Sequence, residues 1–288
     1  MNNSTPDIRT LLAVRNYDLS ATLAGGQAFR WRQQAGAWEG VIGRRWVRLL
    51  TEESGILAET AEPQAEWSWL EEYLQARLEL ESVLGTFPDD EPMRASVVAC
   101  RGLRLLRQDP WECLASFILS STKQIVQIQQ IIGLLCARYG SPVRVPAGHE
   151  PAWAFPTAEQ LAAAPEEGLR ACKMGFRAPN LLATARRIAN GELPLEELRA
   201  VSLDEALARL LELPGVGVKI AHCVLLFAYG FPQAFPVDVW VSKALRQLYF
   251  PKHRPSTARL RRFVASHFGP HAGYAQQYLF HYMRTRRP

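Results

Sequence analysis

The chain contains 288 residues, of which 48% are hydrophobic, and carries a formal net charge of +5. A chain of this length can bury the core of one large domain or of two ordinary ones. It has no run of about 18 or more apolar residues, which excludes a membrane-spanning helix. The first residues, MNNSTPDIRT, have neither the basic start nor the apolar core of a signal peptide, so no export is expected.

The five cysteines are too scattered to form a recognisable site. They stand at positions 100, 113, 136, 172 and 223, with no pair separated by two residues. This spacing argues against a zinc site, an iron–sulfur cluster and a disulfide framework, and it favours a reducing, cytoplasmic setting.

The charge is divided unevenly along the chain. Residues 1–95 contain 9 Lys and Arg against 15 Asp and Glu, a net charge of −6, whereas residues 96–288 contain 24 against 13, a net charge of +11. The second part is therefore the one that would meet a polyanionic partner. From charge alone, an ordinary solvated basic surface explains the excess equally well.

The N-terminal part is expected to be rich in β-structure. AFRWR (28–32), WEGVI (38–42) and WVRLL (46–50) are short runs with β-branched and aromatic residues, separated by turn-forming stretches. They predict an antiparallel meander, and WSWLEEYLQARLEL (67–80) predicts a helix after it.

From about residue 98 the pattern changes to helices. Asp109, Pro110 and Glu112 form the arrangement of a cap, a first-turn proline and a capping-box acid. Further helix boundaries are expected at Thr157 to Gln160, Ser202 to Glu205, Gly191 and Gly230. The sequence thus predicts an α+β protein, in which an antiparallel sheet domain (residues 1–97) is followed by an α-helical body (residues 98–288).

The stretch LPGVGVK (213–219) predicts two helices joined by a tight turn, a helix-hairpin-helix at about residues 206–229. Gly215 and Gly217 permit the turn, and the second helix would begin at Val218 with unpaired backbone N–H groups that suit a phosphate. A plain interhelical turn is the alternative interpretation of this stretch.

Lys219 and Asp238 are the candidate catalytic residues. The positive end of a helix and partial burial would both favour the uncharged amine of Lys219, which is the nucleophilic form. Asp238, in the Gly/Pro-rich loop at 230–240, precedes a new helix and could face a developing cation while capping that helix. A lysine that reaches water or phosphate, and an aspartate that only caps, are the alternatives.

Several stretches together resemble the 8-oxoguanine DNA glycosylases of the helix-hairpin-helix superfamily. They are GGQAFRW (25–31), RLLRQDPWECLASFILSS (104–121), MGFRA (174–178), LPGVGVKIA (213–221), PVDV (236–239) and YAQQYLF (274–280), so the resemblance covers nearly the whole chain. It implies a sheet domain packed on two interleaved helical subdomains, with the lesion pocket between those subdomains. The absence of clustered cysteines after Cys223 and the presence of Lys219 separate the chain from the iron–sulfur and alkylbase-excising branches.

The resemblance implies a bifunctional glycosylase and AP lyase that excises 8-oxoguanine from duplex DNA. Lys219 would attack C1′ of the extruded nucleotide and form a Schiff base, and Asp238 would stabilise the cationic transition state. No cofactor is expected, although the carbonyls of Leu211, Leu213 and Val216 could hold a structural cation. We expect a monomer that works without a membrane, in the bacterial cytoplasm at the nucleoid or in a eukaryotic nucleus.

The resemblance also assigns residues to the damaged base. The Gly26 carbonyl would accept the N7 proton that distinguishes 8-oxoguanine from guanine, and Gln276 would read the Watson–Crick edge. Phe280 and Cys223 would pack on the two faces of the base. A Gly-Gly turn, a core phenylalanine and an inert buried cysteine are the ordinary explanations for three of these residues taken singly.

The match departs from the family where the opposite base is read. Thr122 and Gln127 stand at the positions of an asparagine and an arginine that contact the opposite cytosine, whereas Arg177 keeps the other arginine. Phe176 replaces the wedge tyrosine, and Trp240 replaces a phosphate-contacting histidine. With fewer donors, we expect a weaker preference for cytosine than the family norm.

Two other functions stay open at this point. One is a glycosylase of the same superfamily with another damaged base as substrate. The other is a non-catalytic helix-hairpin-helix protein that only binds DNA, which the co-occurrence of Lys219, Asp238, Gln276 and Phe280 disfavours.

Overall fold

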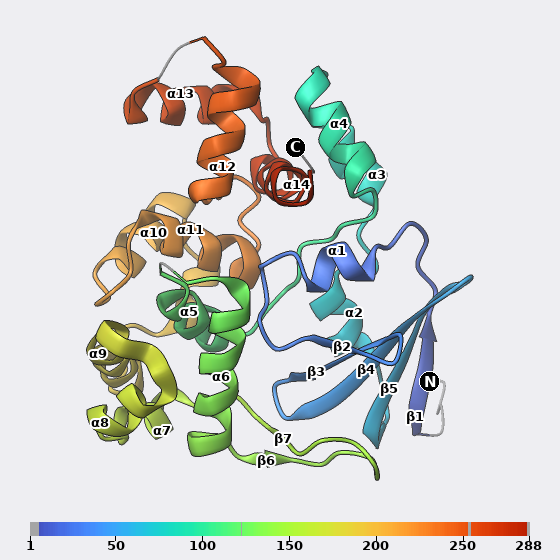
Figure 1. Ribbon diagram of the computed structural model, residues 1–288, viewed down its shortest axis with the longest axis vertical. Coiled ribbons are helices and arrows are strands. Elements are labelled where there is room, and N and C mark those ends of the chain that lie inside the picture. The colour runs from blue at the N-terminus through green and yellow to red at the C-terminus, as the bar shows by residue number, and fades with distance from the viewer. Residues whose placement is uncertain (1–5, 122, 253–254, 287–288) are drawn as a thin grey trace.

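The computed structural model describes residues 6–121, 123–252 and 255–286. Within these ranges the chain forms an α+β fold, with a sheet formed by the N-terminal residues and a helical body formed by the rest (Figure 1). None of the helices in the described ranges combines the length and apolar character needed to cross a bilayer.

The sheet has five antiparallel strands in the order β1-β5-β4-β3-β2. The strands are β1 (Asp7–Leu12), β2 (Arg32–Gln34), β3 (Ala37–Ile42), β4 (Arg45–Glu52) and β5 (Gly55–Gln64). The register pairs Trp38 with Leu49 and Val41 with Trp46, so large apolar side chains lie opposite one another across β3 and β4. The predicted antiparallel meander is confirmed, and β1 and β5 extend it beyond the expected strands.

The strand expected at residues 28–32 is wrong, because only Arg32 belongs to β2. Side-chain hydrogen bonds, and not the backbone hydrogen bonds between paired strands, hold the chain before β2. The Gln27 side chain, which is fully buried, donates to the carbonyls of Thr22 and Arg104 and accepts from the N–H of Leu106. The loop therefore bonds to an extended segment of the helical body and not to the sheet.

The single helix expected at residues 67–80 is also wrong. It is two short helices, α2 (Ser68–Leu74) and α3 (Leu80–Leu84), because Gln75 adopts a left-handed conformation with φ of 52°. Leu74 packs in the core beneath the sheet, whereas Leu80 packs in the core of the helical body. One straight helix could not place both residues in their separate cores.

The predicted helix boundaries in the second part are confirmed where caps were expected. Asp109 accepts from the N–H of Glu112 at 2.8 Å, Thr157 and Gln160 form a capping box, and Ser202 accepts from the N–H of Glu205. Gly191 and Gly230 have positive φ after their helices.

The other elements follow in chain order, and the major ones are labelled in Figure 1. They are α1 (Leu19–Leu23), α4 (Glu91–Ala99), α5 (Pro110–Leu119), α6 (Ile125–Tyr139), β6 (Pro142–Val143), β7 (Ala152–Trp153), α7 (Ala158–Ala162), α8 (Glu166–Leu169), η1 (Arg170–Met174), η2 (Gly175–Arg177), α9 (Ala178–Ala189), η3 (Leu195–Arg199), α10 (Leu203–Leu211), α11 (Val218–Val224) with its continuation η4 (Leu225–Tyr229), α12 (Val239–Ala244) with its continuation η5 (Leu245–Tyr249), α13 (Thr257–His267) and α14 (Ala272–Thr285).

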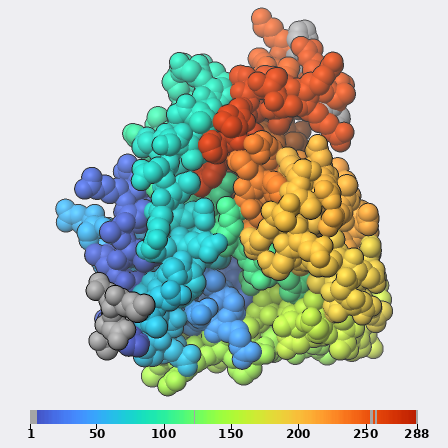
Figure 2. Space-filling view, turned by 180° about the vertical axis from the view of Figure 1, so that it is seen from behind, coloured from blue at the N-terminus to red at the C-terminus, as the bar shows by residue number. Residues whose placement is uncertain are grey.

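Helix α4 comes from the N-terminal half of the chain but packs against α14 near the C-terminus, as Figure 2 shows from behind. The division expected between residues 97 and 98 falls inside this helix and stays a prediction. The contact matters for the site, because α14 carries two of the predicted base-binding residues.

Candidate active site

The turn of the helix-hairpin-helix joins α10 to α11 as predicted. Gly215 has φ of +80°, and a Cβ atom there would lie 2.8 Å from the Cβ of Asn180, so this position requires glycine. Gly217 precedes α11 with open space around it, and Val218 is 44% exposed. The turn thus offers an uncovered helix N-terminus on which a phosphate could approach closely.

Lys219 lies in the first turn of α11 and is half-buried. Its Nζ donates to the Ser120 hydroxyl at 3.4 Å and lies 5.1 Å from the centre of the Phe117 ring. Both partners belong to the end of α5, where the chain leaves the helix. The amine is therefore held at the wall of a cleft and not in the protein core.

Asp238 is the N-cap of α12, and its carboxylate accepts from the N–H of Val241 at 2.8 Å. A helix N-terminus alone would lower the pKa of this carboxyl. Burial instead raises the pKa of Asp238, against the opposing effects of the Val241 hydrogen bond and the positive charge of Lys219. The positive charge of Lys219 therefore favours the ionised form of the Asp238 carboxyl.

One cleft of about 750 Å³ brings the predicted residues together. Its walls come from the end of α5, the start of α6, α11, the loop before α12, and α14. The predicted site residues that line it are Gly26, Lys219, Cys223, Asp238, Trp240, Gln276 and Phe280. A chain segment from the N-terminal part thus meets residues more than half the chain length away.

The predicted base-binding residues lie in the interior of this cleft. Gly26 has φ of +75°, and a Cβ atom there would lie 3.3 Å from Cζ of Phe280. Gln276 is 3% exposed, and no group in the described part of the chain donates to its buried Oε1. Burial raises the pKa of Cys223 to about 11, so its thiol stays protonated at neutral pH. The buried Oε1 of Gln276 is an acceptor without a donor, which costs free energy unless a ligand supplies the donor.

The described residues that are expected to read the opposite base do not line this cleft, and their role stays a prediction. Thr122 lies outside the described residues. Gln127 uses its side-chain oxygen to accept from the N–H of Gln124 at 3.1 Å, which caps α6. Phe176 is 63% exposed, as a wedge would be, whereas Arg177 is buried and donates to the carbonyls of Met174 and Ser121.

The three carbonyls expected to hold a cation lie around the hairpin turn. The Leu213 carbonyl accepts from the N–H of Val216 at 3.1 Å. Among the described residues, no donor bonds to the carbonyls of Leu211 and Val216. Two unengaged carbonyl oxygens fit a hard cation, and the cation site stays a prediction.

The chain matches two known family models over most of its length. The family model for the N-terminal domain of 8-oxoguanine DNA glycosylase matches residues 9–114, and the model for HhH-GPD superfamily base excision DNA repair proteins matches residues 115–270. The chain belongs to the 8-oxoguanine DNA glycosylase family. In the glycosylase, the boundary between the two matched parts falls inside α5, near the cleft.

Relatives support the same assignment over most of the chain. The glycosylase is 31% identical to the N-glycosylase/DNA lyase OGG1 of Arabidopsis thaliana, over 91% of this chain and 76% of the relative. It is 29% identical to the probable N-glycosylase/DNA lyase of Methanothermobacter thermautotrophicus, over 95% of both chains.

Solved structures match the whole architecture. MBOgg1 in complex with a low affinity DNA ligand has a TM-score of 0.91 and 29% identity, over 98% of both chains. The Clostridium acetobutylicum 8-oxoguanine glycosylase/lyase, in complex with duplex DNA containing cytosine opposite 8-oxoguanine, has a TM-score of 0.88 and 33% identity, over 93% of this chain and 92% of that chain.

Sequence reasoning missed several residues of the glycosylase cleft. Ser120 and Phe117 hold the Lys219 amine, and Lys123 and Arg284 also line the cleft. The pair Ser120-Ser121 at the end of a well-capped helix is a sequence signal that could have indicated the first of these residues. No sequence signal indicated Lys123 and Arg284, because single basic residues are common on a protein surface.

His222 was also missed, although it supports the loop that carries Asp238. Its Nδ1 accepts from the N–H of Phe235 at 3.1 Å, which requires that nitrogen to be unprotonated. Burial is the main cause that lowers the pKa of His222 from its ordinary value, with Arg261 acting in the same direction.

This histidine predicts a loss of stability in acid. Because the folded state holds His222 neutral while the unfolded chain protonates near pH 6.5, the full free energy of unfolding is present above pH 6.5. It should fall as the pH drops from there through the lowered pKa of the folded state. Urea unfolding of the wild type and His222→Gln between about pH 5 and about pH 8 measures this, and His222→Gln should show the weaker pH dependence. Equal pH dependence would contradict the assignment.

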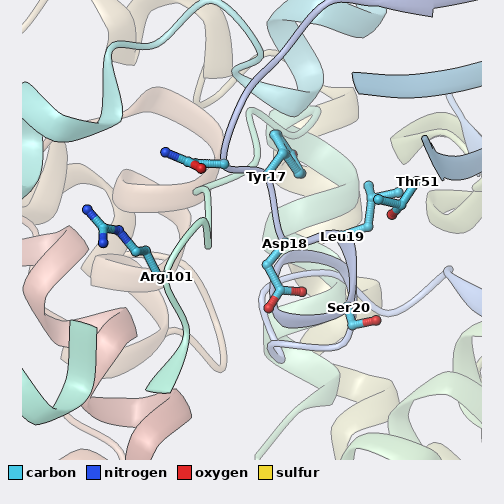
Figure 3. Close-up of a pocket in the computed structure, with 7 residues that line it drawn as sticks. Tyr17, Asp18, Leu19, Ser20, Thr51 and Arg101 are labelled. Atoms are coloured by element: carbon cyan, nitrogen blue, oxygen red, sulfur yellow. The ribbon is translucent and has the colours of Figure 1, made fainter. Parts of the chain in front are cut away.

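A separate pocket of about 330 Å³ shares no residue with the cleft. Figure 3 shows it between the Tyr17–Ser20 segment, Thr51 and Arg101. The carboxylate of Asp18 in this pocket accepts from the N–H of Ala21 and caps α1, which explains its presence structurally. The pocket is therefore separate from the cleft that holds the candidate catalytic residues.

Proposed function

We propose that the protein is a bifunctional DNA glycosylase and AP lyase that removes 8-oxoguanine from duplex DNA in base excision repair. The observation that carries the proposal is the single cleft in which the Lys219 amine and the Asp238 carboxylate meet Gly26, Gln276 and Phe280. A flipped nucleotide in this cleft would have its sugar near the amine and its base among the other three residues.

The chemistry follows from the groups at the sugar. The uncharged Nζ of Lys219 forms a bond to C1′ while the bond from C1′ to the base breaks, and the base leaves with a proton. The carboxylate of Asp238 stabilises the positive charge that develops on the sugar. Ring opening gives a Schiff base, and loss of a C2′ proton then eliminates the 3′-phosphate and nicks the strand.

Recognition of the base follows from two acceptors. 8-Oxoguanine carries a proton on N7 where guanine has a lone pair, so the Gly26 carbonyl would attract the first and repel the second. The buried Oε1 of Gln276 would accept from the N–H groups of the Watson–Crick edge. The aromatic face of Phe280 would stack on the base.

Incubation with borohydride tests the proposal. A duplex with one 8-oxoguanine opposite cytosine should release the free base, be nicked, and form a covalent adduct that borohydride reduction preserves. The matching guanine duplex is the control and should give none of the three. Binding without base release would favour a DNA-binding protein, and release of a different base would favour another glycosylase of the superfamily.

The partner would be duplex DNA, bound through phosphates at the hairpin and around Trp240. Such binding should weaken steeply with salt, because each neutralised phosphate releases counterions. The enzyme would work where chromosomal DNA lies, in a bacterial nucleoid or a eukaryotic nucleus.

A relaxed preference for the opposite base is the second expectation. Gln127 caps its own helix and Arg177 bonds to backbone carbonyls, so few donors face that base. We expect single-turnover excision rates opposite the four bases to lie within about tenfold of each other, since a good bidentate contact is worth about 1–3 kcal/mol.

A gain-of-preference variant sharpens this test. Thr122→Asn combined with Gln127→Arg should raise the rate ratio of cytosine over the other bases by at least about fivefold. Gln127→Ala is the control, because it removes the α6 cap without adding a guanidinium. A wild type with a strong cytosine preference would contradict the expectation.

A further inference from the structure

The backbone carbonyls of the loop at residues 24–27 differ in whether a side chain donates a hydrogen bond to them. Ala24 accepts from Nη2 of Arg284 at 2.8 Å, Gly25 accepts from Nε2 of Gln277 at 2.7 Å, and Gln27 accepts from Nε2 of Gln108 at 2.7 Å. Within residues 6–121, 123–252 and 255–286, no group donates to the carbonyl of Gly26. Side chains thus bond to the carbonyls on both sides of Gly26 and leave the Gly26 carbonyl available to a ligand.

The two α14 side chains in this arrangement are built into the fold. Gln277 is 2% exposed, and a Cβ atom on Gly25 would lie 3.2 Å from its Nε2. The guanidinium of Arg284 lies 5.8 Å from the centre of the Phe280 ring, and its Nη1 is buried with no partner among the described residues. Surface side chains that merely attract DNA would not be packed in this way.

The same helix therefore contacts the loop and lines the cleft proposed to hold the base. Gln276 and Phe280 line the cleft. Gln277 and Arg284 line it as well, and their side chains also donate to the carbonyls before Gly26. Any shift of the loop relative to the helix would move the Gly26 carbonyl relative to the stacking ring. The hydrogen bonds of Gln277 and Arg284 oppose that shift.

We propose that Gln277 and Arg284 are positioning residues that fix the peptide between Gly26 and Gln27 with its carbonyl available to the damaged base. The inference rests on the proposed function and extends it. A Gly-Gly loop has little intrinsic preference for one peptide orientation. If this peptide turned over, it would present an N–H to the cleft, and that N–H would donate a hydrogen bond to the N7 lone pair of undamaged guanine.

The peptide is restrained from both sides. On its N-terminal side the Gly25 carbonyl is bonded by Gln277, and on its C-terminal side the Gln27 side chain and carbonyl are bonded to residues 104–108. Loss of the Gln277 bond would free the N-terminal side while the buried Gln27 still held the other. Discrimination between 8-oxoguanine and guanine should then fall more than catalysis does.

Binding in a Lys219→Gln background measures this discrimination without turnover. The ratio of the dissociation constants for a guanine duplex and an 8-oxoguanine duplex should fall about tenfold in Gln277→Leu, as expected for the loss of one buried hydrogen bond. Cleavage of a preformed abasic site by Gln277→Leu with Lys219 intact should change by less than about threefold, since no base is read there.

Arg284 has a matched control in Arg286, which follows the last residue of α14. Arg284→Gln and Arg286→Gln each remove one positive charge, but only Arg284 bonds to the loop. Arg284→Gln should lower the discrimination ratio and Arg286→Gln should not, while Arg284→Lys should restore part of it.

The outcomes separate the inference from the function beneath it. Unchanged ratios in Gln277→Leu and Arg284→Gln would overturn the positioning role, as would abasic-site cleavage that falls as much as base excision. A wild type that nicks abasic DNA but never excises 8-oxoguanine would instead remove the proposed substrate, and the inference with it.

Discussion

Lys219→Gln is expected to abolish the borohydride-trapped adduct and to slow both base release and strand nicking by at least about a thousandfold. The reason is chemical, since an amide nitrogen cannot form a Schiff base with C1′. The variant should still fold, because the lost contacts are one hydrogen bond to Ser120 and one contact with the Phe117 ring, together worth about 1–2 kcal/mol.

The cleft contains its own control for this experiment. Lys123 also lines the cleft, but it lies in the turn before α6 and not at the N-terminus of α11. Lys123→Gln removes the same charge and amine from the same cavity and should still give the trapped adduct. Trapping on both single variants would show that either amine can react and would contradict the unique role of Lys219.

Lys219→Gln also separates the alternatives. Continued base release without any adduct would mean that water attacks C1′ and that Lys219 is structural. Measurement of duplex binding by the same variant shows whether the cleft still binds DNA. Undiminished binding with no chemistry is the result that the Schiff-base mechanism requires.

The local chemistry of helix ends made much of the body predictable. Asp109, Thr157 and Ser202 each accept the hydrogen bond that their spacing indicated, because a cap depends on residues within one turn. The same locality placed Lys219 in the first turn of α11 and Asp238 at the cap of α12. Their meeting in one cleft came from the family resemblance, since no local pattern fixes such a distance.

Structural features that depend on contacts between residues far apart in the sequence could not be predicted. AFRWR has the composition of a strand, yet Gln27 bonds to residues 104–108 and holds the start of this stretch away from the sheet. Arg177 matches a base-reading arginine in sequence, and that role stays a prediction. Its bond to the carbonyl of Ser121, 56 residues earlier, could not be predicted. In both cases a buried side chain satisfies backbone groups of a distant segment, and sequence spacing carries no trace of that pairing.

Asp238→Asn is expected to slow base excision by about 10²–10³-fold while leaving the fold intact. Asparagine is as good an N-cap as aspartate, so the hydrogen bond to the N–H of Val241 can persist. The substitution therefore removes the negative charge that faces the sugar and little else. Asp238→Ala removes the cap as well and should cost about a further 1 kcal/mol in the free energy of unfolding.

The pH dependence distinguishes charge from capping. The ionised carboxylate is the active form, so the single-turnover rate of the wild type should fall in acid as the pH drops through the pKa of Asp238. Burial raises that pKa, so the fall begins at a higher pH than for a free carboxyl. Asp238→Asn should lack this acidic limb while unfolding at a urea concentration close to that of the wild type. If the asparagine variant instead kept the wild-type rate, Asp238 would be only the cap of α12, and the charge that stabilises the sugar cation would have to come from another group.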